Sequence, residues 1–363
     1  MKMLKKYWIL LIGAAAFQGA ALAQNNEAQL KAYEGEMGVF TQHHEHITLE
    51  FEKDELVAHS NVVREILLLS DNAAGFFNTG SVYHSYFHAL ENMEGASLVP
   101  SDKGFTRYKA TKVRTKPSRS ESVFYDDVKE SEVFFTHLKK GAKTLLTYSM
   151  SYRDIHMLPK FYFQNYLPIL DASFSVTFPK GLELEGLLQG ADVDWIKKTV
   201  TENKKTTTIT WHATNVPKAK VFSDAPRFGY YAPHLVIFIK NYTKPKSNSP
   251  VAVFNNVSDL NRYVYRFVEN VNKEDDKHIA DKVKELTHGL NTEDSKAAAI
   301  YTWVQNNIKY VAFEDSLGGF VPREASEVYR RRFGDCKDMA GLLRPMCSAA
   351  GMEPRYVWMG TRD

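Results

Sequence analysis

The chain has very few cysteines, because only Cys336 and Cys347 among its 363 residues carry a thiol. A fold that depends on a framework of disulfides is therefore excluded. If one helix holds both cysteines, a rise of about 1.5 Å per residue separates them by roughly 16 Å, whereas a disulfide needs Cα atoms within about 7 Å. We expect both thiols to stay unbridged, with Cys347 deeper on the same helix face as an apolar filler and Cys336 as the reactive candidate.

Long apolar runs are also lacking outside the N-terminus, which argues against a membrane span in the rest of the chain. The N-terminus has the pattern of a secretory signal peptide: lysines within the first six residues, a short apolar run over Trp8–Phe17, and small residues at Ala21–Ala23. The short run and the cleavage pattern argue against an uncleaved anchor. We predict a signal peptide over residues 1–23, with Gln24 as the first mature residue. Its destination is the periplasm or cell envelope, with an extracellular location as the alternative.

The chain lacks a strong excess of charge of either sign. Its formal net charge is +3, and the predicted signal peptide contributes three lysines and no acids, so the mature chain is close to neutral. A nearly neutral chain gives no reason to expect a nucleic-acid partner.

Residues 24–255 contain short segments rich in β-branched and aromatic residues, separated by polar turns. Clear examples are Ile47–Phe51, Asn61–Leu69, Lys143–Tyr152, Ala172–Phe178, Thr206–Ala213 and His234–Ile239. Regular short strands with Pro and Gly between them are typical of an antiparallel β-sandwich. The stretch Tyr242–Pro250 has the composition of a linker.

Residues 256–363 change to helical periodicity, which makes the whole chain a multi-domain α+β protein. We expect a helix capped by Ser258 that reaches Val271, one ending near Gly289, one capped by Asn291 or Thr292, a short helix over Glu324–Arg332, a helix that begins at Cys336, and a strand over Arg355–Met359. Within the Cys336 helix, Pro345 should deprive the Gly341 carbonyl of its helical partner and produce a kink.

The run Gly334-Asp335-Cys336-Lys337-Asp338 places a thiol where a polar turn meets an apolar helix. The free N–H groups and the positive dipole end of a helix favour thiolate over thiol, and they can donate hydrogen bonds to a developing oxyanion. Lys337 would favour the thiolate, whereas Asp335 and Asp338 would oppose it. A buried, inert cysteine is the alternative that these residues alone leave open.

The stretch from about Ser295 to Arg362 resembles the transglutaminase-like, papain-like cysteine core. The resemblance rests on the order of a helix ending in Val304–Tyr310, a Gly-containing loop leading to Pro322, and then Gly334–Asp338 before Leu342-Leu343 and Ala350-Gly351. It implies that Cys336 attacks an amide or related acyl carbon, assisted by a His and an Asp on later strands. The upstream region resembles a sandwich module of unknown function, through Gly141, Tyr148, Tyr152, Pro168 and Phe178–Gly181.

No histidine lies between Cys336 and Asp363, so the implied His and Asp are expected beyond residue 363. We therefore expect residues 256–363 to form a transglutaminase-like domain that is incomplete at its C-terminus. The chain alone should be inactive and poorly stable, because it would leave a sheet edge uncovered.

Two functions fit these observations. The first is an exported acyl-transfer protein that hydrolyses or transfers amide or peptide bonds through a Cys336 thioester, acting on peptides, proteins or cell-envelope material. The second is a non-catalytic envelope scaffold whose sandwich binds a glycan or a protein. Neither function calls for a cofactor.

Other residues offer weaker candidate sites. On a strand, His44 and His46 of the run His43–His46 would share a face, but no third metal ligand is placed, so we predict no metal site. His84 and His88 could serve Cys336 only by crossing between domains. An aromatic carbohydrate platform is a third alternative, but core packing explains its residues better; they are Tyr162, Phe163, Tyr166, Tyr230 and Tyr231.

Overall fold

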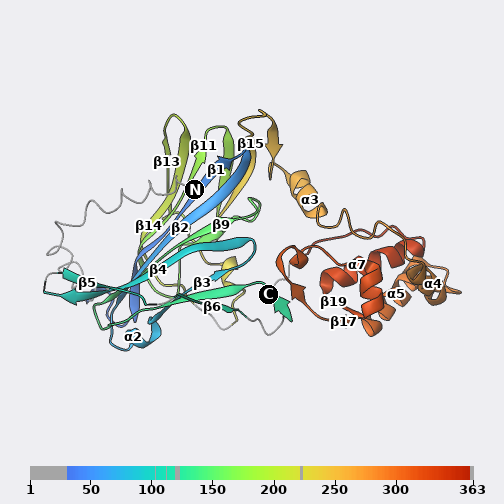
Figure 1. Ribbon diagram of the computed structural model, residues 1–363, viewed down its shortest axis with the longest axis horizontal. Helices are drawn as coiled ribbons and strands as arrows, with labels where there is room; N and C mark the ends of the chain where they lie inside the picture. The colour runs from blue at the N-terminus through green and yellow to red at the C-terminus, as the bar shows by residue number, and fades with distance from the viewer. Residues whose placement is uncertain (1–30, 103, 112, 119–122, 221–223, 360–363) are drawn as a thin grey trace.

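The computed structural model describes residues 31–102, 104–111, 113–118, 123–220 and 224–359. The predicted signal peptide, residues 1–23, lies outside the described residues. A sheet-rich part is followed by a smaller helical part, as expected from the sequence (Figure 1). In the described part of the chain, no helix is both long and apolar enough to cross a bilayer.

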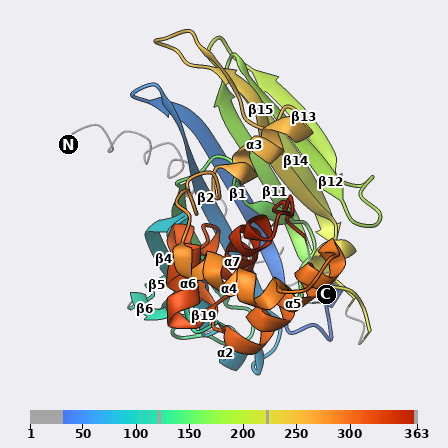
Figure 2. The same cartoon turned by 90° about the vertical axis from the view of Figure 1, so that its right-hand side faces the viewer.

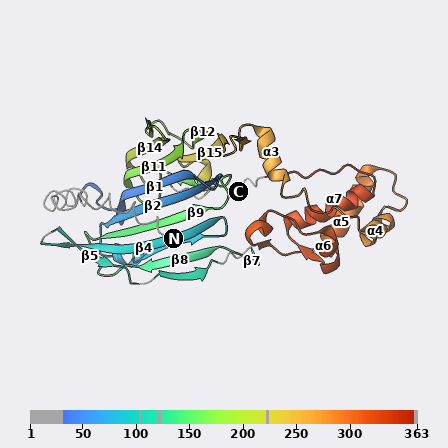
Figure 3. The same ribbon diagram turned by 45° about the horizontal axis from the view of Figure 1, so that its top comes forward.

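The largest sheet among the described residues has eight strands, in the order β13-β14-β11-β1-β2-β9-β4-β5 (Figure 3). Each segment predicted from the sequence as a strand in residues 24–255 coincides with a strand, in this sheet or in β15 of the next one, except that β2 ends one residue before the predicted Leu69. The strands of the large sheet are β1 (Gly38–Glu52), β2 (Glu55–Leu68), β4 (His88–Ser101), β5 (Gly104–Lys109), β9 (Lys143–Tyr152), β11 (Ile169–Pro179), β13 (Lys197–Glu202) and β14 (Thr206–Val216).

Two smaller sheets pack on the large one and complete a sandwich. One contains β10 (Lys160–Tyr162), β12 (Leu182–Gln189), β15 (His234–Thr243) and β16 (Pro250–Ala252). The other contains β3 (Thr79–His84), β6 (Val113–Pro117) and β8 (Lys129–Phe134), and short helical turns lie at α2 (Ala73–Phe76) and η1 (Phe228–Tyr230). The sheets approach closely at Gly186, where a Cβ atom would lie 2.4 Å from the ring of Trp211. The core between them includes Ile47, Phe174 and Trp211 from the large sheet and Leu235 and Ile239 from β15.

One pairing in the large sheet differs from the expected all-antiparallel pattern, because β1 and β11 run parallel. Parallel neighbours need a long crossover connection, whereas a tight hairpin joins only antiparallel strands. Residues 53–168 provide that connection, and they include most of the other strands of the sandwich. The short-range pattern of the sequence carries no information about a pairing between such distant segments.

The helical part follows as α3 (Val257–Tyr265), α4 (Lys277–Thr287), α5 (Glu293–Asn307), β17 (Lys309–Tyr310), β18 (Phe313–Glu314), η2 (Ser316–Gly319), α6 (Ala325–Arg331), β19 (Phe333–Gly334) and α7 (Cys336–Ala349). Viewed along the long axis, α4 to α7 form one cluster in front of the sheets (Figure 2). Buried side chains from α4, α5 and α7, among them Val283, Ile300 and Leu342, form its core. Strand β7 (Tyr125–Asp126) of the sheet-rich part pairs with β18 of the helical part.

Three expectations for the helical part are wrong. Asn256, not Ser258, caps α3, because its side chain accepts the N–H groups of Ser258 and Asp259 and forms a capping box. That helix ends at Tyr265, so Val271 is buried in the irregular chain that follows. The predicted strand over Arg355–Met359 has no regular structure, because no strand in the described part of the chain pairs with it.

Candidate functional site

Cys336 is the first residue of α7, and its side chain is exposed. The turn before it depends on Gly334, where a Cβ atom would lie 2.7 Å from the Cβ atom of Asp338. The Cys336 thiol is not buried. Both Cys336 and Cys347 are free thiols, as predicted.

A capping box holds the start of α7. The Asp335 carboxylate accepts the backbone N–H of Asp338 at 3.3 Å, and the Asp338 carboxylate accepts the backbone N–H of Asp335 at 3.2 Å. Both side chains are buried, at 3% and 0% exposure, so this end of the helix is fixed against fraying. The Cys336 thiol therefore projects from a rigid helix start.

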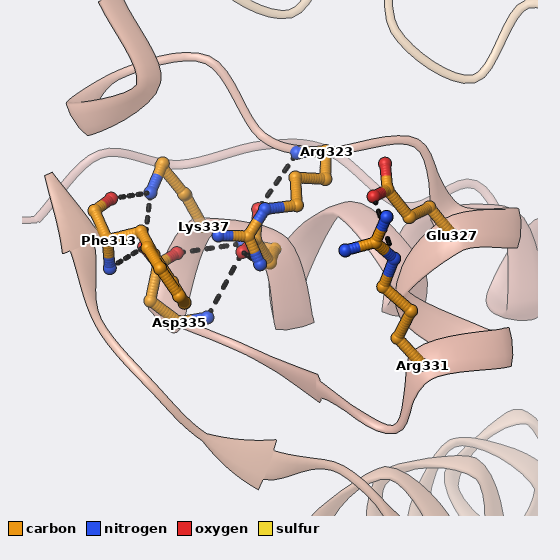
Figure 4. Close-up of polar contacts among 7 residues, drawn as sticks. Phe313, Arg323, Glu327, Arg331, Asp335 and Lys337 are labelled. Carbon is orange, nitrogen blue, oxygen red and sulfur yellow. Dashed lines mark hydrogen bonds and ion pairs between the residues drawn. The ribbon is translucent and has the colours of Figure 1, made fainter. Parts of the chain in front are cut away.

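Each buried carboxylate of the box also has a cationic partner (Figure 4). The Lys337 ammonium pairs with Asp335 and donates to the Phe313 carbonyl at 3.2 Å. On the other side, the Arg323 guanidinium lies 3.2 Å from Asp338, and the Arg323 backbone N–H donates to the same carboxylate at 2.8 Å. The negative charges beside Cys336 are thus balanced locally by Lys337 and Arg323.

Tyr310 lies against the thiol. Its phenol is close enough to interact with both the side chain and the backbone of Cys336. Burial, together with the nearby Cys336 and Asp335, raises the pKa of this phenol. The sequence places Tyr310 in an extended segment before the helix, but nothing in its pattern indicates that the hydroxyl reaches the thiol.

Cys336 opens into a cavity of about 640 Å³. Its walls include Leu343 and Cys347 of α7, Glu314 of β18, Phe320 directly after η2, and Trp358. The rings of Phe320 and Trp358 lie nearly parallel, at 10° with centroids 6.0 Å apart, and Phe320 also stacks on Phe267 at 5.2 Å. The cavity is therefore largely apolar and aromatic, with the thiol at its edge.

Cys347 lies on the same side of α7 as Cys336, as its spacing predicts, and it lines the same cavity. It is half-buried, and burial raises the pKa of its thiol. Of the two thiols, only Cys336 combines an exposed side chain with the start of the helix.

None of the described residues that line this cavity is a histidine. His84 hydrogen-bonds Ser131 at 2.9 Å and His88 hydrogen-bonds the Met157 carbonyl at 2.9 Å, both within the sandwich. The structure therefore does not bring these two histidines to Cys336.

Two of the histidines of β1, His44 and His46, lie close to polar side chains of the neighbouring strand β11. His44 lies 3.0 Å from a carboxylate oxygen of Asp171, and His46 lies 2.7 Å from the Ser175 hydroxyl. Among the described residues, one different group, Glu50, Glu52 and His59, is close enough together to hold a metal ion. Both glutamates are exposed, and the group does not belong to the Cys336 cavity.

The aromatic residues considered as a carbohydrate platform are not all at the surface. Phe163 is fully buried, whereas Tyr166 and Tyr230 are more than half exposed. Tyr162 packs on Phe228 and His234. Core packing accounts for part of this set, as expected.

Comparison with known proteins identifies both parts of the chain. Residues 280–363 match the transglutaminase-like superfamily, and residues 60–220 match a domain of unknown function, DUF3857. No curated protein matches the chain. Solved structures do match the chain, and one of them covers 87% of it.

That structure is a candidate protease from Parabacteroides distasonis, with 18% identity and a TM-score of 0.66 over 87% of this chain and 59% of that one. The likeness shows a shared fold, and the chain spans about three fifths of that protein's length. Two other solved structures match too weakly to support an argument. An M1 zinc metallopeptidase from Deinococcus radiodurans has 11% identity and a TM-score of 0.29, over 55% of this chain and 42% of that one. A candidate nutrient-binding protein from Legionella pneumophila has 6% identity and a TM-score of 0.26, over 76% of this chain and 81% of that one.

Cys336 thus begins the helix of the region that matches the superfamily, and the sandwich before it holds the second matched region. The chain combines a DUF3857 domain with a domain of the transglutaminase-like superfamily.

Proposed function

We propose that the chain belongs to an exported cysteine enzyme that cleaves or transfers amide bonds through a thioester on Cys336. The observation that carries this proposal is the exposed Cys336 thiol at the start of α7, beside a cavity large enough for a peptide side chain. The match to the transglutaminase-like superfamily supports the same chemistry. The N-terminal signal pattern of the sequence supports export to the periplasm or cell envelope.

In the proposed reaction, the Cys336 sulfur attacks the carbonyl carbon of an amide, and the C–N bond breaks as the amine leaves with a proton. The resulting thioester is then attacked by water, which gives a carboxylic acid, or by a second amine, which gives a new amide. Either attack returns the free thiol. In this proposal, N–H groups at the start of α7 stabilise the oxyanion, and Tyr310, which lines the same cavity as Cys336, orients the sulfur.

The apolar and aromatic cavity favours peptide or protein substrates with an apolar side chain near the amide that is attacked. The charged partners of the site, Lys337 and Arg323, are already occupied by Asp335 and Asp338. Recognition of a highly charged substrate would therefore have to come from other residues.

The test is the Cys336→Ala substitution in the complete protein. We expect it to abolish hydrolysis of casein and incorporation of dansylcadaverine into casein, because no nucleophile remains at the start of α7. The circular dichroism spectrum and the melting temperature should change little, because the exposed thiol contributes little to the core. Turnover that persists in the folded variant would reject the thioester mechanism and favour a non-catalytic scaffold.

A further inference from the structure

The sandwich contacts the helical part directly at one wall of the Cys336 cavity. We define the wall segment as residues 312–320, which include the cavity-lining residues Glu314, Gly319 and Phe320. Strand β7 of the sandwich pairs in parallel with β18 in this segment, and the Phe124 N–H donates to the Ala312 carbonyl at 3.0 Å. Figures 1 and 3 show that β7 extends away from the sheets toward the helical part.

Asp127 ties this contact to the body of the sandwich. One of its carboxylate oxygens accepts the backbone N–H of Ser316 at 3.3 Å, and the other accepts the backbone N–H of Tyr86 at 2.5 Å. Residue 86 follows strand β3, so a single side chain joins a loop of the sandwich to the wall segment. Next to it, the ring of Phe87 packs edge-on against Phe320 at 5.5 Å.

The residue that Asp127 holds has an unfavourable backbone conformation. Ser316 has a φ of +52°, in the left-handed region that residues other than glycine adopt only when their surroundings impose it. The Ser316 N–H that binds Asp127 opens the 3₁₀ turn η2, which leads to Phe320. The hydrogen bond from the Ser316 N–H to Asp127 therefore stabilises a turn that the local sequence does not favour.

The same wall segment is also bonded to the start of α7. The Phe313 carbonyl accepts the Lys337 ammonium, and the Phe313 N–H lies 3.4 Å from the Asp335 carboxylate. The side chain of Phe313 packs on Phe124 of the sandwich, with ring centroids 5.2 Å apart. The wall is thus held from one side by the sandwich and from the other by the residues that flank Cys336.

We propose that the sandwich segment Phe124–Asp127 is a positioning element of the Cys336 site, with Asp127 as its positioning residue. Asp127 holds the wall segment in the shape that lets an apolar acyl substrate reach the thiol. Asp127 lies in the region of this chain that matches DUF3857, so the proposal gives that region a role in the site of the region that follows it. The proposal rests on the proposed function, because it concerns substrate access to the same thiol.

The test compares two alkylating probes on the chain: iodoacetamide, which is small, and benzyloxycarbonyl-Gly-Phe chloromethyl ketone, which must occupy the cavity. Mass spectrometry with peptide mapping follows the rate at Cys336. In Asp127→Ala we expect the rate for the peptide probe to fall by about tenfold, since small misplacements near a reacting atom have large effects. The iodoacetamide rate should stay at the wild-type value, because the thiol and its helix start are unchanged.

Two further variants sharpen the test. Asp127→Asn keeps one carbonyl oxygen as an acceptor, so its peptide-probe rate should lie between those of the wild type and the alanine variant. Asp126→Ala is the matched control, because Asp126 lies in the same segment but, among the described residues, its side chain accepts the nearby Val128 N–H and no hydrogen bond from the wall segment. Its two rates should equal those of the wild type.

An unchanged ratio of the two rates in Asp127→Ala would overturn the proposal. This includes an equal fall in both rates, which would mean that the substitution affects the thiol itself or the folding of the protein. If neither probe modifies Cys336 in the wild type, the proposed function fails instead. Hydrogen exchange at residues 312–320 would then still decide the role of Asp127, with faster exchange in Asp127→Ala expected and equal exchange contradicting it.

Discussion

At the scale of single residues, Glu45 shows how the sandwich holds a carboxyl group away from water. It lies on β1 two positions before the buried Ile47, where burial raises its pKa to about 7 against the opposing influences of Arg64, Ser60 and Tyr152. Its neighbour His43 is shifted the other way, since burial lowers the pKa of that imidazole to about 3. Both groups therefore favour the neutral form inside the sheet.

Glu45→Gln isolates the effect of this carboxyl group on stability. The folded-state pKa of Glu45 is raised, so the folded protein binds more protons than the unfolded chain between about pH 4.5 and 7. Wild-type stability consequently loses a contribution as the pH rises through that window, and the glutamine variant does not. We expect its melting temperature, relative to wild type, to increase from pH 4.5 to pH 8. A constant difference across this range would contradict a raised pKa.

The sequence correctly predicts that a helix begins at Cys336, because the run Gly334–Asp338 combines a capping pattern with the first residues of an apolar helix. Glu45 shows what the local sequence pattern cannot predict. Period-two alternation assigns it to one face of a strand, but only the packed sheets show that this face is closed. Tyr310 and Arg323 escape prediction for the same reason, since their partners, Cys336 and Asp338, come from other elements.

At the scale of secondary-structure elements, α7 runs from Cys336 to Ala349 with a proline inside it. Pro345 has no N–H for the Gly341 carbonyl, as the sequence predicts. The side-chain amide of Asn272 replaces that donor at 2.8 Å, and its oxygen accepts the Ala325 N–H at 2.6 Å. The Asn272 side chain, in the segment before α4, thus replaces the hydrogen bond that α7 lacks at Gly341 and accepts an N–H at the start of α6.

Asn272→Gly should destabilise the helical part by about 1–3 kcal/mol, the cost of leaving buried polar groups without partners. Glycine suits this test because Asn272 has a φ of +57°, which glycine adopts without strain. Adding Pro345→Ala restores an N–H for Gly341, so it should stabilise the Asn272→Gly variant more than it stabilises the wild type. Urea unfolding of the four proteins gives this coupling, with the exposed Asn306→Ala as a control. Strictly additive effects would exclude the repair.

Helices and strands with strong local patterns could be predicted, including β9 over Lys143–Tyr152 and α5 with its Thr292 cap. The repair by Asn272 could not, because it joins residues 69 positions apart in the chain. The proline signals that a carbonyl needs a donor, but not where the donor lies. The parallel pairing of β1 with β11 belongs to the same class of long-range information.

At the scale of the whole molecule, two junctions join the sandwich to the helical part. One is the pairing of β7 with the wall segment beside Cys336. The other surrounds Asp154, which pairs with the Arg266 guanidinium and accepts the Tyr263 hydroxyl at 3.2 Å. His156 stacks on Tyr263 with ring centroids 4.1 Å apart. Because α3 itself buries little apolar surface, this polar junction fixes the direction in which the helical part leaves the sandwich.

Asp154→Asn should weaken this second junction in a pH-dependent way. Burial opposes the charged carboxylate, but hydrogen bonds from His156 and Arg266 prevail and hold its pKa well below the usual range. A depressed pKa contributes stability above the ordinary carboxyl pKa near 4, and that contribution is lost as the pH falls below it. We therefore expect the variant to lose on the order of 1–2 kcal/mol at pH 7, with the difference from wild type shrinking toward pH 2. Calorimetry measures it, and Asp171→Asn, on the sandwich away from α3, is the control. A difference independent of pH would show that Asp154 acts through packing, and that the junction does not depend on its charge.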